Sequence, residues 1–201
     1  MSEKRLVLAS KNPGKLRELR ALLADTGIEV VALDSSAPEV EETGDSFEAN
    51  ALIKARAAVA ATGLPALGED SGLVVDALGG EPGIHSHRWA PGTDMDRVYA
   101  LLRRMEGIPP GRRTARYVSC IAIVTPWGRE EVVKGTLEGE IGLAPRGSGG
   151  FGYDPIFVLP DGRTVAELSL EEKNAISHRA KSLAQAKAIL PALLEEGRVP
   201  S

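Results

Sequence analysis

The segment Thr114–Thr125, TARYVSCIAIVT, is followed by the tripeptide Pro126-Trp127-Gly128 and then by Arg129–Leu137, REEVVKGTL. Both segments are rich in β-branched residues, and the tripeptide between them has the composition of a tight turn. Together they predict an antiparallel hairpin. Because a purely parallel sheet contains no hairpin, this stretch predicts that the sheet of the protein is mixed.

Strands and helices are expected to alternate in the residues before this hairpin. We expect a strand at 5–9, a helix in which the leucines at 16, 19, 22 and 23 follow a 3.6-residue period, and a strand at 29–33. An acidic loop, 39–45, then leads to a long helix, 46–62. Asp45 and Glu48 form a capping-box pattern at its start, and Gly63 follows its end.

The remaining elements are shorter. Strands at 66–68 and 73–75 are expected to flank the tetrapeptide Glu69-Asp70-Ser71-Gly72, and an amphipathic helix is expected at about 94–105. A short strand at 156–158 and helical patterning from residue 169 almost to the end complete the chain, with Ser177 as the N-cap of the last helix. The predicted fold class is α/β, a mixed β-sheet with flanking helices.

Composition indicates a globular protein. The chain has 201 residues, of which 43% are hydrophobic and 26% are charged, and we expect a single domain over 1–201. The net charge of −4 argues against a general affinity for nucleic acid or for anionic membranes. The single cysteine, Cys120, cannot form an internal disulfide, and the N-terminal residues lack the pattern of a secretory signal, so we expect a cytoplasmic protein.

The segment Ser10-Lys11-Asn12-Pro13-Gly14-Lys15 lies where a strand is expected to end and a helix to begin. Backbone amides at a helix N-terminus and a nearby lysine favour an anion, and phosphate is the natural ligand. The segment is not a Walker loop, because its glycine pattern differs and leucine follows the lysine. The alternative interpretation is an ordinary turn with a surface lysine.

A second group of residues is acidic. Glu69 and Asp70 are adjacent at the end of a predicted strand, and Glu41 and Glu42 lie in the acidic loop. Carboxylates beside a phosphate-binding turn suit Mg²⁺, which prefers one or two protein carboxylates together with water and substrate phosphate. A polar turn capped by Asp70 is the alternative.

The segment 147–154, GSGGFGYD, matches the pattern G-x-G-x-x-G, but a strand follows where a dinucleotide-binding fold requires a helix. We therefore reject that fold. Phe151 and Tyr153 are two of only eight aromatic residues, and an aromatic ring beside flexible backbone can stack on a base.

Basic residues gather near the predicted last helix. Arg179 and neighbouring amides could recognise a keto oxygen of a purine, with Lys173 about one turn earlier, although a capped helix with exposed basic residues is the simpler interpretation. Lys54 lies midway along the long helix and could point inward or outward. His85 and His87 have no evident third metal ligand, so we expect no role for them.

Six motifs, taken in order, resemble one family over nearly the whole chain. They are Ser10-x-Asn12-x-x-Lys15, Glu41-Glu42-Thr43-Gly44, Glu48-Ala-Asn50-Ala-x-x-Lys54-Ala, Asp70-Ser71-Gly72-Leu73, Gly149-Gly150-Phe151-Gly152-Tyr153-Asp154-Pro155 and Lys173-x-x-x-Ser177-His178-Arg179. The family is that of the non-canonical purine nucleoside triphosphate pyrophosphatases, the ITP/XTP pyrophosphatases.

This resemblance implies an enzyme, a nucleoside-triphosphate pyrophosphatase. It implies that ITP, dITP and XTP are hydrolysed between the α- and β-phosphates, which releases the nucleoside monophosphate and pyrophosphate and keeps damaged purines out of DNA and RNA. It also implies that Mg²⁺ is required, that the protein is a homodimer, and that two lobes surround a central nucleotide-binding cleft.

The resemblance also assigns residues. Asp70 matches the catalytic carboxylate and a metal ligand, and a second metal ligand comes from Glu41 or Glu42, between which the motif does not choose. The positions that match substrate-binding residues are Ser10, Lys11, Asn12, Pro13, Gly14, Lys15, Lys54, Ser71, Phe151, Gly152, Tyr153, Asp154, Lys173, His178 and Arg179. One departure is Glu69, where many relatives have aspartate.

Two other functions are compatible with the same motifs. A non-catalytic purine nucleotide sensor would bind the triphosphate and leave it intact, and a phosphatase would release inorganic phosphate and a diphosphate. The reaction products distinguish these alternatives from a pyrophosphatase.

Overall fold

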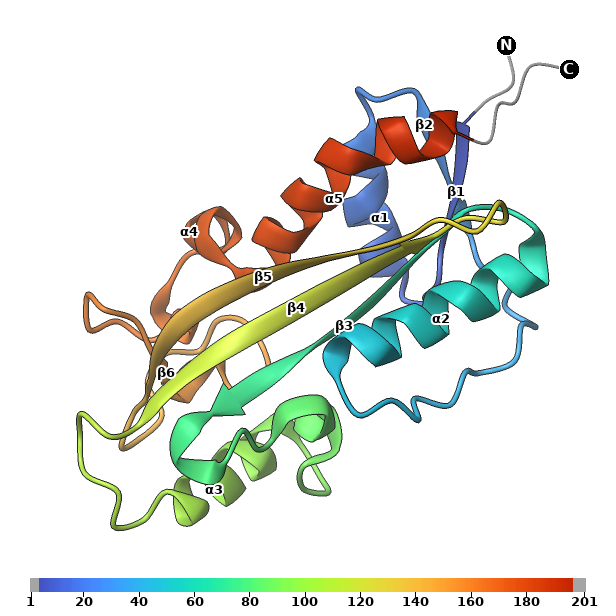
Figure 1. Ribbon diagram of the computed structural model, residues 1–201. Coiled ribbons are helices and arrows are strands. Elements are labelled where there is room, and N and C mark those ends of the chain that lie inside the picture. Colours follow the sequence, from blue (N-terminus) through green and yellow to red (C-terminus); the bar gives the residue numbers. More distant parts are fainter. Residues whose placement is uncertain (1–3, 197–201) are drawn as a thin grey trace, which may run out of the picture. The chain divides into compact units, whose positions relative to one another are not determined.

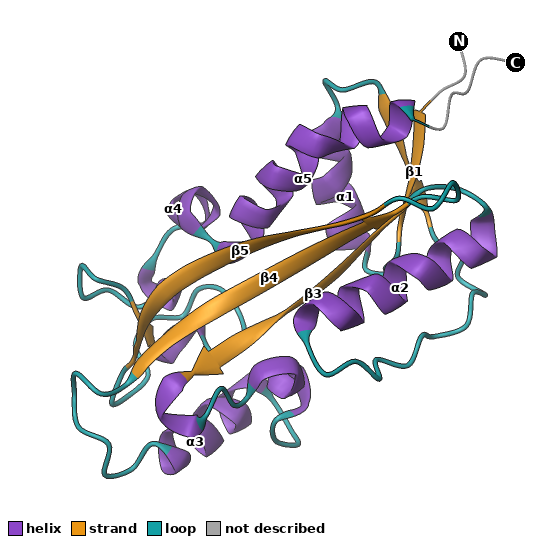
Figure 2. Cartoon of the chain, in the orientation of Figure 1, coloured by secondary structure: helices purple, strands orange, loops and turns teal. Residues whose placement is uncertain are grey.

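The sheet is mixed, as the hairpin predicts. In the computed structural model, which describes residues 4–196, the strand order is β2-β1-β3-β4-β5-β6 (Figures 1 and 2). β1 (Lys4–Leu8) pairs in parallel with β2 (Ile28–Ala32) and with β3 (Ala66–Val75). β5 (Glu130–Ile141) pairs antiparallel with β6 (Phe157–Val158). The predicted fold class is therefore confirmed.

The predicted hairpin is formed by β4 (Thr114–Val124) and β5, which are neighbours in the sheet. The backbone N–H of Thr125 donates to the carbonyl of Arg129 at 2.9 Å, and the N–H of Arg129 donates to Oγ1 of Thr125 at 3.0 Å. These two bonds close the turn that contains Pro126-Trp127-Gly128.

One prediction is wrong at β3. Instead of two short strands separated by a polar turn, a single strand runs through Glu69-Asp70-Ser71-Gly72. Gly68 lets this strand pack directly against α2 (Phe47–Thr62), because a Cβ at that position would collide with the carbonyl oxygen of Ala51. The two buried acids remain in the strand because lysine side chains meet their charges, as described below.

The helices begin and end close to the expected positions. They are α1 (Pro13–Leu23), α2, α3 (Asp94–Arg104), α4 (Leu170–Ile176) and α5 (His178–Glu195), with short 3₁₀ turns at Asp76–Leu78, Gly83–Arg88, Asp154–Ile156 and Val165–Glu167. The capping box expected from Asp45 and Glu48 is wrong, because the N-cap of α2 is Ser46, whose Oγ accepts from the N–H of Ala49 at 3.1 Å. Gly63 ends α2 with φ 67°, in the left-handed region, as expected.

Ser177 separates the last two helices. Its backbone is extended, and its Oγ accepts from the N–H of Ala180 at 3.1 Å, which confirms its role as N-cap of α5. The helical patterning from residue 169 therefore forms two helices rather than one.

The chain divides into two compact units. Unit 1 comprises residues 1–70, 120–134 and 182–201, and unit 2 comprises residues 71–119 and 135–181. In unit 1 the leucines of α1 and α5 pack against one face of β1 and β2, and alanines of α2 pack against the other face. Figure 1 shows the ribbons of α1 and α5 on one side of these strands and that of α2 on the other. The expectation of a single domain over 1–201 stays a prediction.

The core of unit 2 is a separate cluster. In this cluster Val98 and Leu101 of α3 pack with strand residues that precede and follow α3 in the chain, among them Leu73, Tyr117 and Phe157. Among residues 4–196, no helix has both the length and the apolar composition needed to cross a membrane.

Candidate active site

The turn between β1 and α1 is held by its own side chains. Asn12 is the N-cap of α1, and its Oδ1 accepts from the N–H of Gly14 at 2.8 Å and of Lys15 at 3.3 Å. The Oγ of Ser10 accepts from the N–H of Asn12 at 3.2 Å, and Pro13 lies in the first helical turn, where its missing N–H costs little. These bonds define the turn, and they already engage three of the backbone amides that the sequence offered to phosphate.

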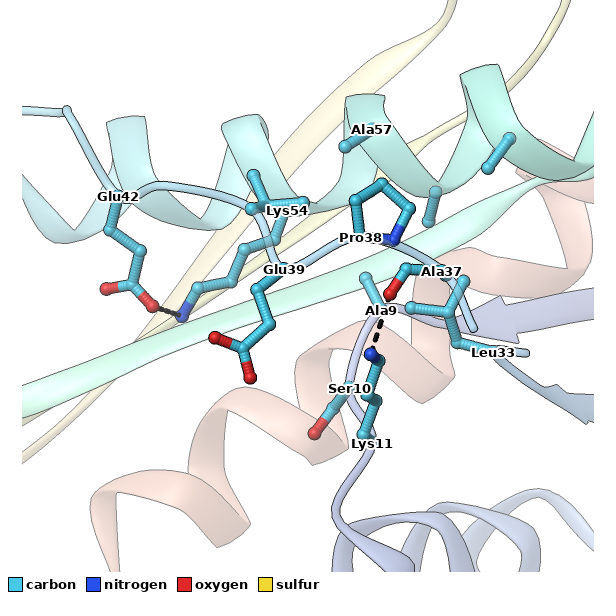
Figure 3. A pocket seen from close by; sticks show the side chains of 13 residues that line it. Ala9, Ser10, Lys11, Leu33, Ala37, Pro38, Glu39, Glu42, Lys54 and Ala57 are labelled. Carbon is cyan, nitrogen blue, oxygen red and sulfur yellow. Dashed lines mark hydrogen bonds and ion pairs between the residues drawn. The ribbon is translucent and has the colours of Figure 1, made fainter. Parts of the chain in front are cut away.

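Lys11 points away from that turn. Its ammonium donates to the carbonyl oxygens of Ala37 at 2.6 Å and of Ser35 at 3.0 Å, which lie in the loop that leads to the acidic segment (Figure 3). Lys11 therefore holds this loop against the β1–α1 turn.

Lys54 joins the acidic loop to β3. Its Nζ lies 2.6 Å from Oε1 of Glu42 and 3.6 Å from Oδ1 of Asp70, and it donates to the carbonyl of Glu69 at 3.0 Å. Figure 3 shows Glu42 and Lys54 pointing toward one another from the loop and from α2. The side chain of Glu41 is exposed, so of the two candidates in the loop it is Glu42 that reaches Lys54.

Glu69 pairs with the other lysine of the site. Its Oε2 lies 3.7 Å from Nζ of Lys15. Burial raises the pKa of the Glu69 carboxyl above its ordinary value, and the charges of Lys15 and Lys54 oppose this rise without cancelling it. Lys15 lies at the start of α1, directly after the β1–α1 turn, and Glu69 is the neighbour of Asp70 in β3. The contact between Lys15 and Glu69 therefore brings the turn close to Asp70.

The acidic residues present here fit a magnesium ion. Within the described part of the chain, no three His, Cys, Asp or Glu side chains gather as a complete metal cage. Mg²⁺ does not need one, because it is commonly held by one or two carboxylates plus water and phosphate. Asp70 and Glu42 are two hard oxygen donors that already share one cation, the ammonium of Lys54.

A pocket of about 320 Å³ lies in unit 1 at the carboxyl end of β1. Its polar wall includes Ser10, Glu39, Glu42 and Lys54 (Figure 3). Its apolar wall is formed largely by alanines of α2 with Leu33, Pro38 and Val40. Polar side chains from the turn, the acidic loop and α2 therefore face one space.

Asp154 holds together the segment 151–154 of unit 2, called here the aromatic segment. Its Oδ1 accepts from the hydroxyl of Tyr117 at 2.9 Å, and its Oδ2 accepts from Nζ of Lys173 at 2.5 Å and from the N–H of Phe151 at 3.1 Å. Burial, followed by the charge of Asp154, raises the pKa of Tyr117 well above its ordinary value, so the hydroxyl stays protonated and donates. The carboxylate of Asp154 is thus bound by three donors of the protein.

A pocket of about 50 Å³ lies beside this network in unit 2. The predicted residues that line it are Ser71, Phe151, Gly152, Tyr153, Asp154, Lys173 and His178. Phe151 is 67% exposed, and Nζ of Lys173 lies 4.1 Å from the centroid of its ring. The pocket therefore has an accessible aromatic surface beside a cation.

Tyr153 and His178 form other parts of the wall. The hydroxyl of Tyr153 donates to the carbonyl of Ser86 at 2.7 Å, and burial raises its pKa to about 12. His178 stacks on Tyr117 with ring centroids 4.9 Å apart, and burial, helped by the charges of Lys173 and Lys181, lowers its pKa to about 4. His178 is therefore neutral at pH 7. Arg179 follows it in α5, and burial lowers the pKa of its guanidinium.

Several residues of these sites escaped sequence reasoning. Tyr117, Ser86, His87, Asp94 and Arg97 line the pocket of unit 2, and Glu39 lines that of unit 1. His87, for which no role was expected, is among them. No local pattern identifies these residues, because strand and helix periodicity marks Tyr117 as core and Asp94 as a residue of the first helical turn.

Comparison with known proteins places the chain in a family. The model of the Ham1 family matches residues 6–189. A protein from Symbiobacterium thermophilum named dITP/XTP pyrophosphatase is 71% identical over 98% of this chain and 100% of its own length, and one with the same name from Geobacillus kaustophilus is 51% identical over 90% and 91%.

A solved structure agrees with this assignment. The structure of a HAM1 protein from Coxiella burnetii superposes with a TM-score of 0.89 at 44% identity, covering 94% of this chain and 99% of that one. Sequence and fold thus match the same proteins over nearly their full length, and the chain belongs to the Ham1 family.

Proposed function

We propose that this protein hydrolyses ITP, dITP and XTP to the nucleoside monophosphate and pyrophosphate, and so keeps damaged purines out of DNA and RNA. The observation that carries the proposal is the ammonium of Lys54 held by Glu42 and Asp70, in a chain that is 71% identical to a protein named dITP/XTP pyrophosphatase. Carboxylates paired with lysines beside a pocket are suited to the hydrolysis of a phosphoanhydride, because they can bind a metal ion, accept a proton and balance phosphate charge.

In unit 1 the carboxylate of Asp70 would accept a proton from the water that attacks the α-phosphorus. Lys15 and Lys54 would balance the negative charge that develops on the departing pyrophosphate. Asp70 and Glu42 would hold Mg²⁺, which when bound neutralises charge on the triphosphate and polarises its oxygens. Ser10 and Asn12 would orient the phosphates from the β1–α1 turn.

In unit 2 the pocket beside Phe151 would take the base. The exposed ring provides a stacking surface for a purine. Arg179 and amides at the start of α5 would donate to a keto oxygen at position 6, a site where an amino group is a poor partner. His178 is neutral, so it can act as a donor or an acceptor at the base without adding charge.

Three further properties form part of the proposal. We infer that the whole chain acts as one domain, that two copies form a homodimer, and that the enzyme works in the cytoplasm on free nucleotides rather than on nucleic acid. The net charge of −4 supports the last point.

A product analysis tests the function. The purified protein is incubated with ITP and MgCl₂, and in parallel with ITP and EDTA, and the products are separated by anion exchange. We expect IMP and pyrophosphate in equal amounts, and only in the magnesium reaction. Recovery of intact ITP would indicate a sensor, and IDP with inorganic phosphate would indicate a phosphatase, and either outcome contradicts the proposal.

A further inference from the structure

A residue outside all the motifs holds the aromatic segment of unit 2. The backbone N–H of Gly152 donates to Oδ2 of Asp94 at 2.7 Å. Asp94 is the first residue of α3, far from Gly152 in sequence. This hydrogen bond therefore connects the aromatic segment to the start of α3.

Asp94 is itself held in a defined orientation. Its Oδ1 accepts from Nη2 of Arg97 at 2.7 Å, and the other terminal nitrogen of Arg97 donates to the carbonyl of Gly92 at 3.0 Å. One carboxylate oxygen is thus used by Arg97 and the other by Gly152. Arg97 and Gly152 together lower the pKa of Asp94, so the carboxylate is charged at neutral pH.

The result is that both amides around Phe151 are bound to carboxylates. The N–H of Phe151 donates to Asp154 at 3.1 Å, and the N–H of the next residue donates to Asp94. Phe151 as a whole is 67% exposed, so core packing does little to fix its side chain. With a φ of 59° at Gly152, the backbone here is one that glycine adopts readily and other residues do not.

We propose that Asp94 is a positioning residue for base binding: by fixing the peptide between Phe151 and Gly152, it holds the ring of Phe151 in the orientation on which a purine stacks. This inference rests on the proposed function of the pocket. Stacking on an aromatic ring tolerates any purine. Asp94 therefore governs the affinity for purine nucleotides in general, whereas Arg179 governs the choice between a keto and an amino group.

The test combines hydrogen exchange with the binding of a product that needs no hydrolysis. For Asp94→Ala we expect faster amide exchange at residues 151–153, and a Kd for IMP and for AMP that rises by the same factor, about tenfold, as the loss of an ordered stacking surface predicts. We expect kcat on ITP to change less than about twofold, because Asp94 contacts no reacting atom. Asp94→Asn retains an acceptor for Gly152 and should restore most of the affinity.

Asp96→Ala is the matched control. Asp96 lies in the same helical turn and accepts from the N–H and the hydroxyl of Thr93, so its loss weakens the cap of α3 without touching Gly152. Its Kd for IMP should equal that of the wild type. The inference is overturned if Asp94→Ala binds IMP normally, or if Asp96→Ala weakens binding equally. Failure of the proposed function is a separate result, since it would appear as wild-type protein that binds IMP but releases no pyrophosphate.

Discussion

The ammonium of Lys54 lies 3.6 Å from Oδ1 of Asp70, and the two side chains are 19% and 6% exposed. Lys54 is also the partner of Glu42, so one lysine balances carboxylates from two different elements. A partly buried charge without a counter-ion is costly, so the ion pairs of Lys54 contribute to stability, in addition to the catalytic role that we propose for this lysine. Two of the predictions below follow from this pair.

Asp70→Asn should abolish most of the activity and leave the fold intact. The amide cannot accept the proton of the attacking water, and removal of a general base typically costs about 10²–10⁴-fold in rate. The measurement is pyrophosphate release from ITP at saturating substrate, alongside far-ultraviolet circular dichroism. Near-normal release from a folded Asp70→Asn protein would show that another group activates the water.

Lys54→Met should lower the stability of the metal-free protein by about 1–3 kcal/mol, because Glu42 and Asp70 lose their shared cation. Added Mg²⁺ should restore part of this loss if these carboxylates bind the metal. Urea unfolding in EDTA measures the loss of stability, and urea unfolding in MgCl₂ measures how much of that loss Mg²⁺ restores.

Lys134→Met is the control for this experiment. Lys134 pairs with Glu48 at 3.5 Å on the surface, where an ion pair contributes little. The free energy of unfolding of Lys134→Met should equal that of the wild type in EDTA and in MgCl₂. A Lys54→Met protein that shows no additional response to Mg²⁺ would argue against Glu42 and Asp70 as the metal ligands.

Arg179→Ala should reduce the preference for ITP over ATP. A donor that matches a keto oxygen and mismatches an amino group contributes about 1–3 kcal/mol of discrimination, equivalent to roughly 10–200-fold in kcat/KM. The ratio of kcat/KM for the two substrates measures it. Lys181→Met, which alters an exposed lysine two residues along α5, should leave that ratio unchanged. An unaltered ratio in Arg179→Ala would assign selectivity to other groups.

His178 should make the free energy of unfolding of the protein pH-dependent. Its pKa falls from an ordinary 6.5 to about 4 in the folded protein, so the unfolded chain takes up the proton first as the pH falls. The neutral imidazole contributes stability that is fully present above pH 6.5 and lost progressively down to about pH 4, a change of about 3 kcal/mol at most.

The difference between wild type and His178→Gln isolates this effect from the carboxyl groups that titrate nearby. The free energy of unfolding is measured in urea at pH values from 7 to 4. The advantage of the wild type over the variant should shrink across this range, and a constant difference would contradict the lowered pKa.

Arg113 should contribute to the stability of the fold without taking part in the proposed reaction. It is buried, and its guanidinium donates to the carbonyl oxygens of Met105, Ile108, Ile141 and Gly142 at 2.8–2.9 Å. Arg113→Met leaves these carbonyls without their donor and should cost about 3–5 kcal/mol. Arg103→Met changes an exposed residue and should cost less than about 0.5 kcal/mol. Equal unfolding midpoints for the two variants would refute the role of Arg113.

Much of the fold could be predicted from local patterns. Leucine periodicity placed α1, and the turn residues at 126–128 placed the hairpin and hence the mixed sheet. The largest failure occurred at two buried polar residues. Glu69 and Asp70 lie within a continuous strand because Lys15 and Lys54 supply counter-charges from distant helices, which no window along the chain reveals.

The candidate site divides in the same manner. Local patterns located the β1–α1 turn correctly between a strand and a helix. They failed at Asp70, which lies inside β3 and not in a turn between two short strands. They did not separate Glu41 from Glu42, nor predict that Lys11 binds loop carbonyls, nor find Asp94.

The sequence by itself determined the order of strands and helices, the mixed sheet and the family, since these depend on residue types at short spacing. Only the tertiary structure decided which charged side chains pair with one another. Two examples are contacts between segments far apart in the chain. They are the ion pairs of Lys54 with Glu42 and Asp70, and the hydrogen bond from Gly152 to Asp94. Their formation depends on the packing of whole elements, which sets distances that no local pattern encodes.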